Sequence, residues 1–70
     1  MKYIQISKFK VREHKNHLMS VLIEWFDLET QTKEIEEVAI EKQPCTTAEE
    51  ITDICYLVLG DNYEIIDLEV

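Results

Sequence analysis

The sequence predicts an α+β fold with the element order β-β-β-α-β, built as one mainly antiparallel four-stranded sheet with a single helix packed on one face. Two observations lead to this prediction. Residues 18–28 (LMSVLIEWFDL) read as a strand, because Met19, Val21, Ile23 and Trp25 alternate without a polar interruption. Residues 47–59 read as a helix that begins with a capping box and ends before Gly60. The length of 70 residues allows one small domain, residues 1–70.

Residues 2–12 are expected to form the first strand. Ile4 and Ile6 share one parity, whereas Phe9 and Val11 share the other, so a bulge or bend is expected at Ser7 and its neighbour. Residues 13–17 are polar and predict a turn into the central strand.

Residues 33–42 (KEIEEVAIEK) leave two readings open after a hairpin loop at residues 29–32. The spacing of Ile35, Val38 and Ala39 suits a helix, whereas the alternation of Val38 and Ile40 suits a strand. We favour the strand, because a ten-residue helix directly after a long strand would need a packing partner of its own.

The helix at residues 47–59 has the clearest local signals in the chain. Thr47 stands three residues before Glu50, and Ile51, Ile54, Cys55 and Val58 form an apolar stripe. Residues 63–70 (YEIIDLEV) are expected to form the last strand. Its predicted inward set is Ile66, Leu68 and Val70, with Tyr63 and Ile65 pointing outward.

Charge is distributed unevenly along the chain, whose net charge is −8. Residues 1–17 contain five basic residues and one acidic residue, whereas residues 18–70 contain two basic and fourteen acidic residues. An acidic body of this kind repels nucleic acids and anionic membranes and attracts basic surfaces. Direct nucleic-acid binding would have to use Lys8, Lys10, Arg12 and Lys15, with Tyr3 and Phe9 for stacking, and we do not expect it.

Catalytic and cofactor signatures are not found, so we expect a non-enzymatic protein without a cofactor or metal. His14 and His17 do not form the H-E-x-x-H zinc pattern, and the single glycine cannot build a phosphate-binding loop. Cys45, just before the helix, has no base beside it in the sequence, and Cys55 lies on the apolar stripe. The first residues lack a signal-peptide core and no run is long enough to span a membrane, so a cytoplasmic location is expected.

One helix is too small to cover both faces of a four-stranded sheet, which points to binding of another protein. The first hypothesis is an inhibitor or accessory module that docks carboxylates on a basic partner surface. Its acidic residues are Glu34, Glu36, Glu37, Glu41, Glu49, Glu50 and Asp53. In size, charge and strand content the chain resembles, in a general way, the small acidic proteins with which phages and mobile elements block host enzymes, and it could act as a nucleic-acid mimic.

The alternative hypothesis is a self-associating structural protein. In this reading the apolar even positions Leu22, Phe26 and Leu28 on the open sheet face are buried in a homodimer. A third reading, a small-ligand binder, has no polar constellation to support it.

Overall fold

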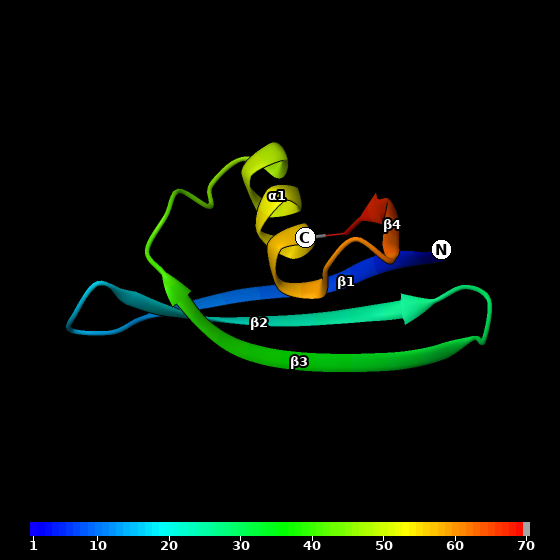
Figure 1. Cartoon of the computed structure of the whole chain (residues 1–70), viewed down its shortest axis with the longest axis horizontal. Helices are drawn as coiled ribbons and strands as arrows, with labels where there is room; N and C mark the ends of the chain where they lie inside the picture. Colours follow the sequence, from blue (N-terminus) through cyan, green and yellow to red (C-terminus); the bar gives the residue numbers. More distant parts are fainter. Residues whose placement is uncertain (70) are drawn as a thin grey trace.

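A computed structural model describes residues 1–69 and contains one four-stranded sheet and one helix (Figure 1). The elements are β1 (Lys2–Glu13), β2 (Leu18–Asp27), β3 (Thr32–Glu41), α1 (Ala48–Leu59) and β4 (Tyr63–Leu68). The predicted order β-β-β-α-β is therefore confirmed.

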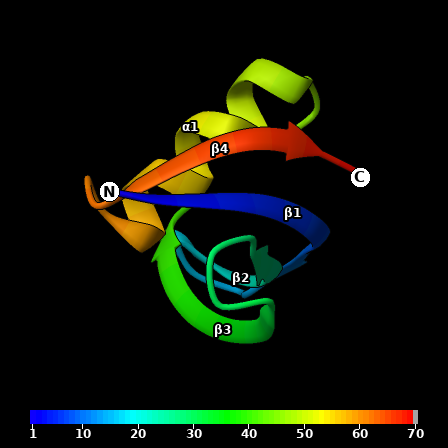
Figure 2. The same ribbon diagram turned by 90° about the vertical axis from the view of Figure 1, so that its right-hand side faces the viewer.

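The sheet has the strand order β3-β2-β1-β4 and is mixed, which corrects the expectation of a mainly antiparallel sheet. β2 is antiparallel to both β1 and β3, whereas β4 is parallel to β1. The connection through α1 carries the chain from β3 at one edge to the opposite edge, where β4 lies beside β1 (Figure 2). The choice of this edge depends on tertiary packing and has no local signal in the sequence.

β2 supplies the buried side of the sheet. Met19, Val21, Ile23 and Trp25 are each at most 6% exposed, as their uninterrupted alternation predicts. They form one core with Ile4 and Ile6 of β1 and Ile54 and Cys55 of α1. Figure 1 shows α1 on this side of the sheet, and no helix among residues 1–69 lies on the other.

The predicted irregularity in β1 is a bulge at Ser7. Ile6 lies opposite Trp25 and Lys8 lies opposite Glu24, so Ser7 is an extra residue in the ladder. Its hydroxyl donates to the carbonyl oxygen of Glu24 at 3.2 Å. The bulge explains why the apolar residues of β1 change parity and still face one core.

β3 is a strand along its whole length, as favoured above. All ten of its residues pair one to one with β2, from Thr32 opposite Asp27 to Glu41 opposite Leu18. In the preceding turn the Gln31 amide donates to the Asp27 carbonyl at 2.8 Å. Gln31 itself adopts a positive φ of 59°. Pairing with a neighbouring strand thus outweighs the helix propensity of this glutamate-rich segment.

α1 begins and ends where the sequence indicates. The Thr47 hydroxyl accepts from the Glu50 amide at 3.1 Å, and the Glu50 carboxylate accepts from the Thr47 amide at 3.1 Å, which together make the capping box. At the other end Gly60 adopts a φ of 91°, which is unfavourable for residues with a side chain.

β4 corrects the predicted orientation of the last strand. Ile66 is 55% exposed, whereas Tyr63 and Ile65 pack against the core. The register against β1 shifts between Ile65 and Asp67, so a second bulge at Ile66 reverses the parity and returns Leu68 to the core. Val70, also predicted to point inward, lies outside the described residues.

Candidate protein-interaction surfaces

The open sheet face, on the side opposite α1, carries a row along β2 that is apolar except at Ser20 and Glu24. Leu22 and Phe26 lie on it and are half-buried, and Leu28 follows in the turn beyond the strand with 37% of its surface exposed. Ile35 of β3 adds a side chain that is 59% exposed. The structure therefore brings the residues of the predicted self-association face onto one side of the sheet or its end.

Opposite charges border this apolar row on its two sides. On β1, Lys8 lies opposite Glu24, Lys10 opposite Leu22, and Arg12 opposite Ser20. On β3, Glu37 lies opposite Leu22 and Glu41 opposite Leu18, whereas Lys33 lies opposite Phe26 at the far end of the strand. Because directly paired residues share a sheet face, Lys10, Leu22 and Glu37 form one transverse row from basic to apolar to acidic.

A shallow hollow of about 230 Å³ lies along this row. Its lining residues are Lys10, Val11, Arg12, Ser20, Leu22 and Glu37. The open face is therefore indented between the basic and the acidic side chains.

The seven carboxylates proposed from the sequence lie on three surfaces. Glu34 and Glu36 lie opposite Trp25 and Ile23 and so share the helix side of the sheet. Glu37 and Glu41 of β3 lie on the open face. The remaining three belong to α1 and are Glu49, Glu50 and Asp53. The strand period of two already implies this division, because Glu34 and Glu36 have even numbers and the open-face pair odd ones.

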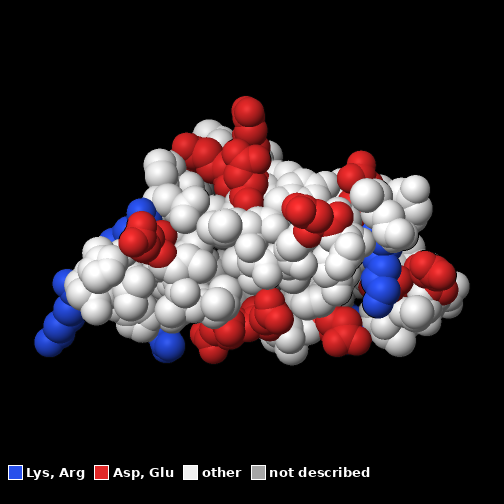
Figure 3. Space-filling model, viewed as in Figure 1, with Lys and Arg blue, Asp and Glu red and all other residues white. Residues whose placement is uncertain are grey.

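The helix side carries carboxylates over α1 and along β3. Figure 3 shows acidic side chains over α1 and along the lower edge of the molecule, with further acidic side chains between them and near both ends, and the basic side chains toward the two ends. Glu49 and Asp53 are exposed and four residues apart, so they lie on one line of the helix surface.

Glu50 is engaged at the helix N-terminus. Hydrogen bonds from the backbone amides of Thr47 and Thr46 lower the pKa of its carboxyl group. The Thr46 hydroxyl also donates to it, at 3.2 Å. This carboxylate is therefore occupied by the cap, and we do not count it among those available to a partner.

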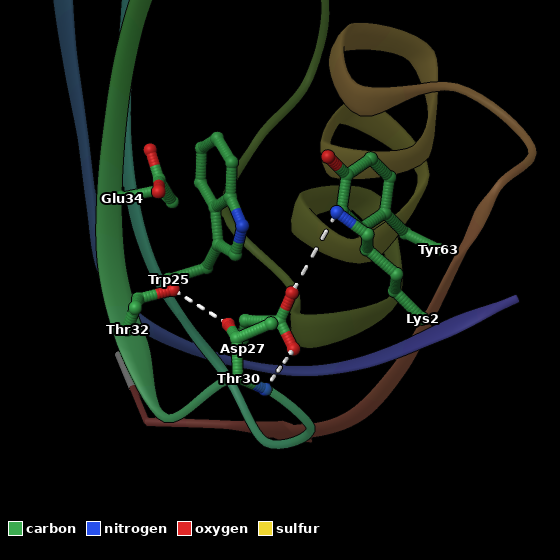
Figure 4. A pocket seen from close by; sticks show the side chains of 7 residues that line it. All are labelled: Lys2, Trp25, Asp27, Thr30, Thr32, Glu34 and Tyr63. Carbon is green, nitrogen blue, oxygen red and sulfur yellow. Dashed lines mark hydrogen bonds and ion pairs between the residues drawn. The ribbon is translucent and has the colours of Figure 1, made fainter.

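A hollow of about 420 Å³ at the end of the helix side was missed by the sequence reasoning (Figure 4). It is lined by Lys2, Trp25, Asp27, Thr30, Thr32, Glu34 and Tyr63. The Trp25 and Tyr63 rings meet edge to face, with centroids 6.0 Å apart. No local signal could have placed Tyr63 here, because its position depends on the pairing of β4 with β1.

Asp27 lies at the base of this hollow and is only 4% exposed. Its carboxylate accepts from the backbone amides of Glu29 at 2.9 Å and Thr30 at 3.2 Å, and it pairs with the Lys2 ammonium at 3.8 Å. The carboxylate thereby holds the β2–β3 turn in place. Glu34 stands on the neighbouring strand, opposite Trp25.

The two cysteines and the histidines are not arranged as a reactive centre. Burial raises the pKa of the Cys55 thiol to about 11, and Cys45 is half-buried against the core. His14 makes a 2.6 Å hydrogen bond to the Ser20 hydroxyl. Among residues 1–69 no group of three or more His, Cys, Asp or Glu side chains is placed to hold a metal ion.

The two aromatic residues considered for stacking on nucleic-acid bases differ in their exposure. Phe9 packs against the core and is not free to stack on a base, whereas Tyr3 is 53% exposed.

Across the described part of the chain, no helix has the length and hydropathy needed to cross a membrane.

Comparisons with protein-family models, with curated proteins and with solved structures find no match for this chain. Function is therefore inferred from the surfaces of the molecule.

Proposed function

We propose that the protein is a small non-enzymatic binding module that docks the acidic helix side on a basic surface of a partner protein. The observation that carries this proposal is the grouping of Glu34, Glu36, Glu49 and Asp53 on one side of the molecule, with basic side chains toward its ends (Figure 3).

These four carboxylates are available for binding. All four residues are exposed, and among residues 1–69 the only ion pair joins Lys2 to Asp27. A partner's lysine or arginine side chains would meet carboxylates that have no competing intramolecular cation. Long-range attraction would also raise the association rate at low ionic strength.

The hollow beside Glu34 also suits a positively charged side chain of a partner. Trp25 forms its apolar wall, and the Glu34 carboxylate stands at its rim on β3 (Figure 4). A lysine or arginine side chain would lay its aliphatic stem on the indole and direct its charge toward Glu34. Lys2 already pairs with Asp27, so Glu34 is the carboxylate left for the incoming cation.

The experiment begins with a tagged protein used to capture partners from the native cell at low and high salt. A variant with E34K, E36K, E49K and D53K should lose the captured partner without loss of the folded circular-dichroism spectrum. A matched variant with four reversals at Glu37, Glu41, Asp67 and Glu69, all exposed and on the open-face side of the sheet, should retain it. Binding that is equal in both variants would refute the proposal.

A nucleic-acid mimic makes a further demand on the captured partner. Duplex DNA or RNA should compete with this protein for the partner, because both would occupy the same basic surface. If the partner binds this protein and the nucleic acid at the same time, the protein is a binding module but not a nucleic-acid mimic.

A further inference from the structure

We infer that the open sheet face binds a second copy of this chain about a two-fold axis that runs parallel to β2. The inference concerns the side opposite the proposed acidic docking surface and does not depend on it. Its starting point is the transverse row in which Lys10, Leu22 and Glu37 lie side by side on neighbouring strands.

The charge pattern decides how two such faces can stack. Rotation about an axis along β2 places β1 of one copy over β3 of the other and keeps each residue at the same level along the strand. Lys10 then faces Glu37 of the second copy, and the reverse contact forms at the same time. Rotation about an axis across the strands would instead place β1 on β1 and β3 on β3, which brings like charges together.

Arg12 suits the same arrangement. Arg12, opposite Ser20 and hence level with Ala39, would lie between the second copy's Glu37 and Glu41, because those residues are two positions away on either side of Ala39. On β2, Leu22 and Phe26 would stack on the same residues of the second copy near the axis, and so would Glu24, beside which Lys8 of β1 supplies the opposite charge. Among residues 1–69 neither Lys10 nor Arg12 has an intramolecular ion-pair partner, so their charges are free for the contact.

The interface would be small. Three strands spaced about 4.8 Å apart and about eight residues long give a footprint of roughly 400 Å² per copy. A standard interface buries about 800 Å² of each partner. We therefore expect a weak, concentration-dependent dimer, whose two acidic helix sides remain exposed on the outside.

Sedimentation velocity of the full chain from about 5 to 500 μM tests this arrangement. The wild type should dimerise, and K10E or E37K alone should raise Kd about tenfold, because each turns two attractive contacts into repulsive ones. An equimolar mixture of K10E and E37K should dimerise again, since each copy then offers the charge that the other lacks. Lys10 and Glu37 are exposed, so both variants should keep the wild-type circular-dichroism spectrum.

L57D serves as the matched control, because Leu57 is 62% exposed but lies on α1. It should dimerise like the wild type. A wild type that stays monomeric at 500 μM would overturn the inference. So would single variants that associate like the wild type, a mixture that does not recover, or an L57D protein that is weakened as much as K10E.

Discussion

Asp27 offers the sharpest test of how this small fold is held together. It is buried, its carboxylate accepts hydrogen bonds from two backbone amides of the β2–β3 turn, and it forms an ion pair with Lys2. Replacing it with alanine should remove both hydrogen bonds and lower the free energy of unfolding by about 2–3 kcal/mol. A domain of this size has roughly 3.5–10 kcal/mol of stability, so the loss is a large fraction of the total.

The asparagine variant separates the turn from the charge. D27N keeps one oxygen in place for both amides and loses only the pair with Lys2, whose side chain is 54% exposed. A pair with one exposed partner contributes about 0–1 kcal/mol, so D27N should stay close to the wild type. E29A in the same turn is the control and should change the stability by less than about 0.5 kcal/mol.

Urea denaturation followed by fluorescence provides the measurement, because the chain has one tryptophan, Trp25, two residues before Asp27. A D27N protein as unstable as D27A would show that the charge, rather than the turn, supplies the stability. A D27A protein within 0.5 kcal/mol of the wild type would show that the turn needs no side-chain support.

Four further outcomes follow from the structure. Deleting Ser7 should preserve cooperative urea unfolding, because Ile6 and Lys8 already lie opposite the consecutive residues Trp25 and Glu24 and the apolar side chains of β1 would keep facing the core; S7A should likewise cost less than about 1 kcal/mol. T47A should lower the free energy of unfolding by about 1 kcal/mol through loss of the helix cap, measured by thermal circular dichroism. Because the pKa of Glu50 is lowered in the folded state, its ionised carboxylate stabilises the protein fully above about pH 4.5, the ordinary pKa of glutamate, and this stabilisation is lost as the pH falls through the lowered pKa. The melting temperature of E50Q should therefore lack this dependence on acidic pH. At pH 8 an aromatic disulfide reagent should modify Cys45 in the folded protein but Cys55 only in denaturant, because Cys55 is buried and its thiol pKa is raised to about 11.

The sites follow from the sequence only in part. Leu22 and Phe26 share the open face because a strand has a period of two, and that much could be predicted. The same period divides the acidic residues of β3 between two faces, which a grouping by composition overlooks. The hollow at Trp25 could not be predicted, because Tyr63 and Lys2 reach it through the β1–β4 pairing.

Local physical chemistry in the sequence determined the helix, the central strand and the first bulge. Thr47 and Glu50 satisfy the free amides at the start of α1, and the parity change around Ser7 requires an extra residue in β1. Tertiary structure decided the rest. β3 became a strand because β2 offered it ten pairing partners, and β4 took the edge beside β1, with a second bulge at Ile66. Which strand lies next to which depends on contacts between residues far apart in the chain, and a local pattern of apolar residues carries no information about those contacts.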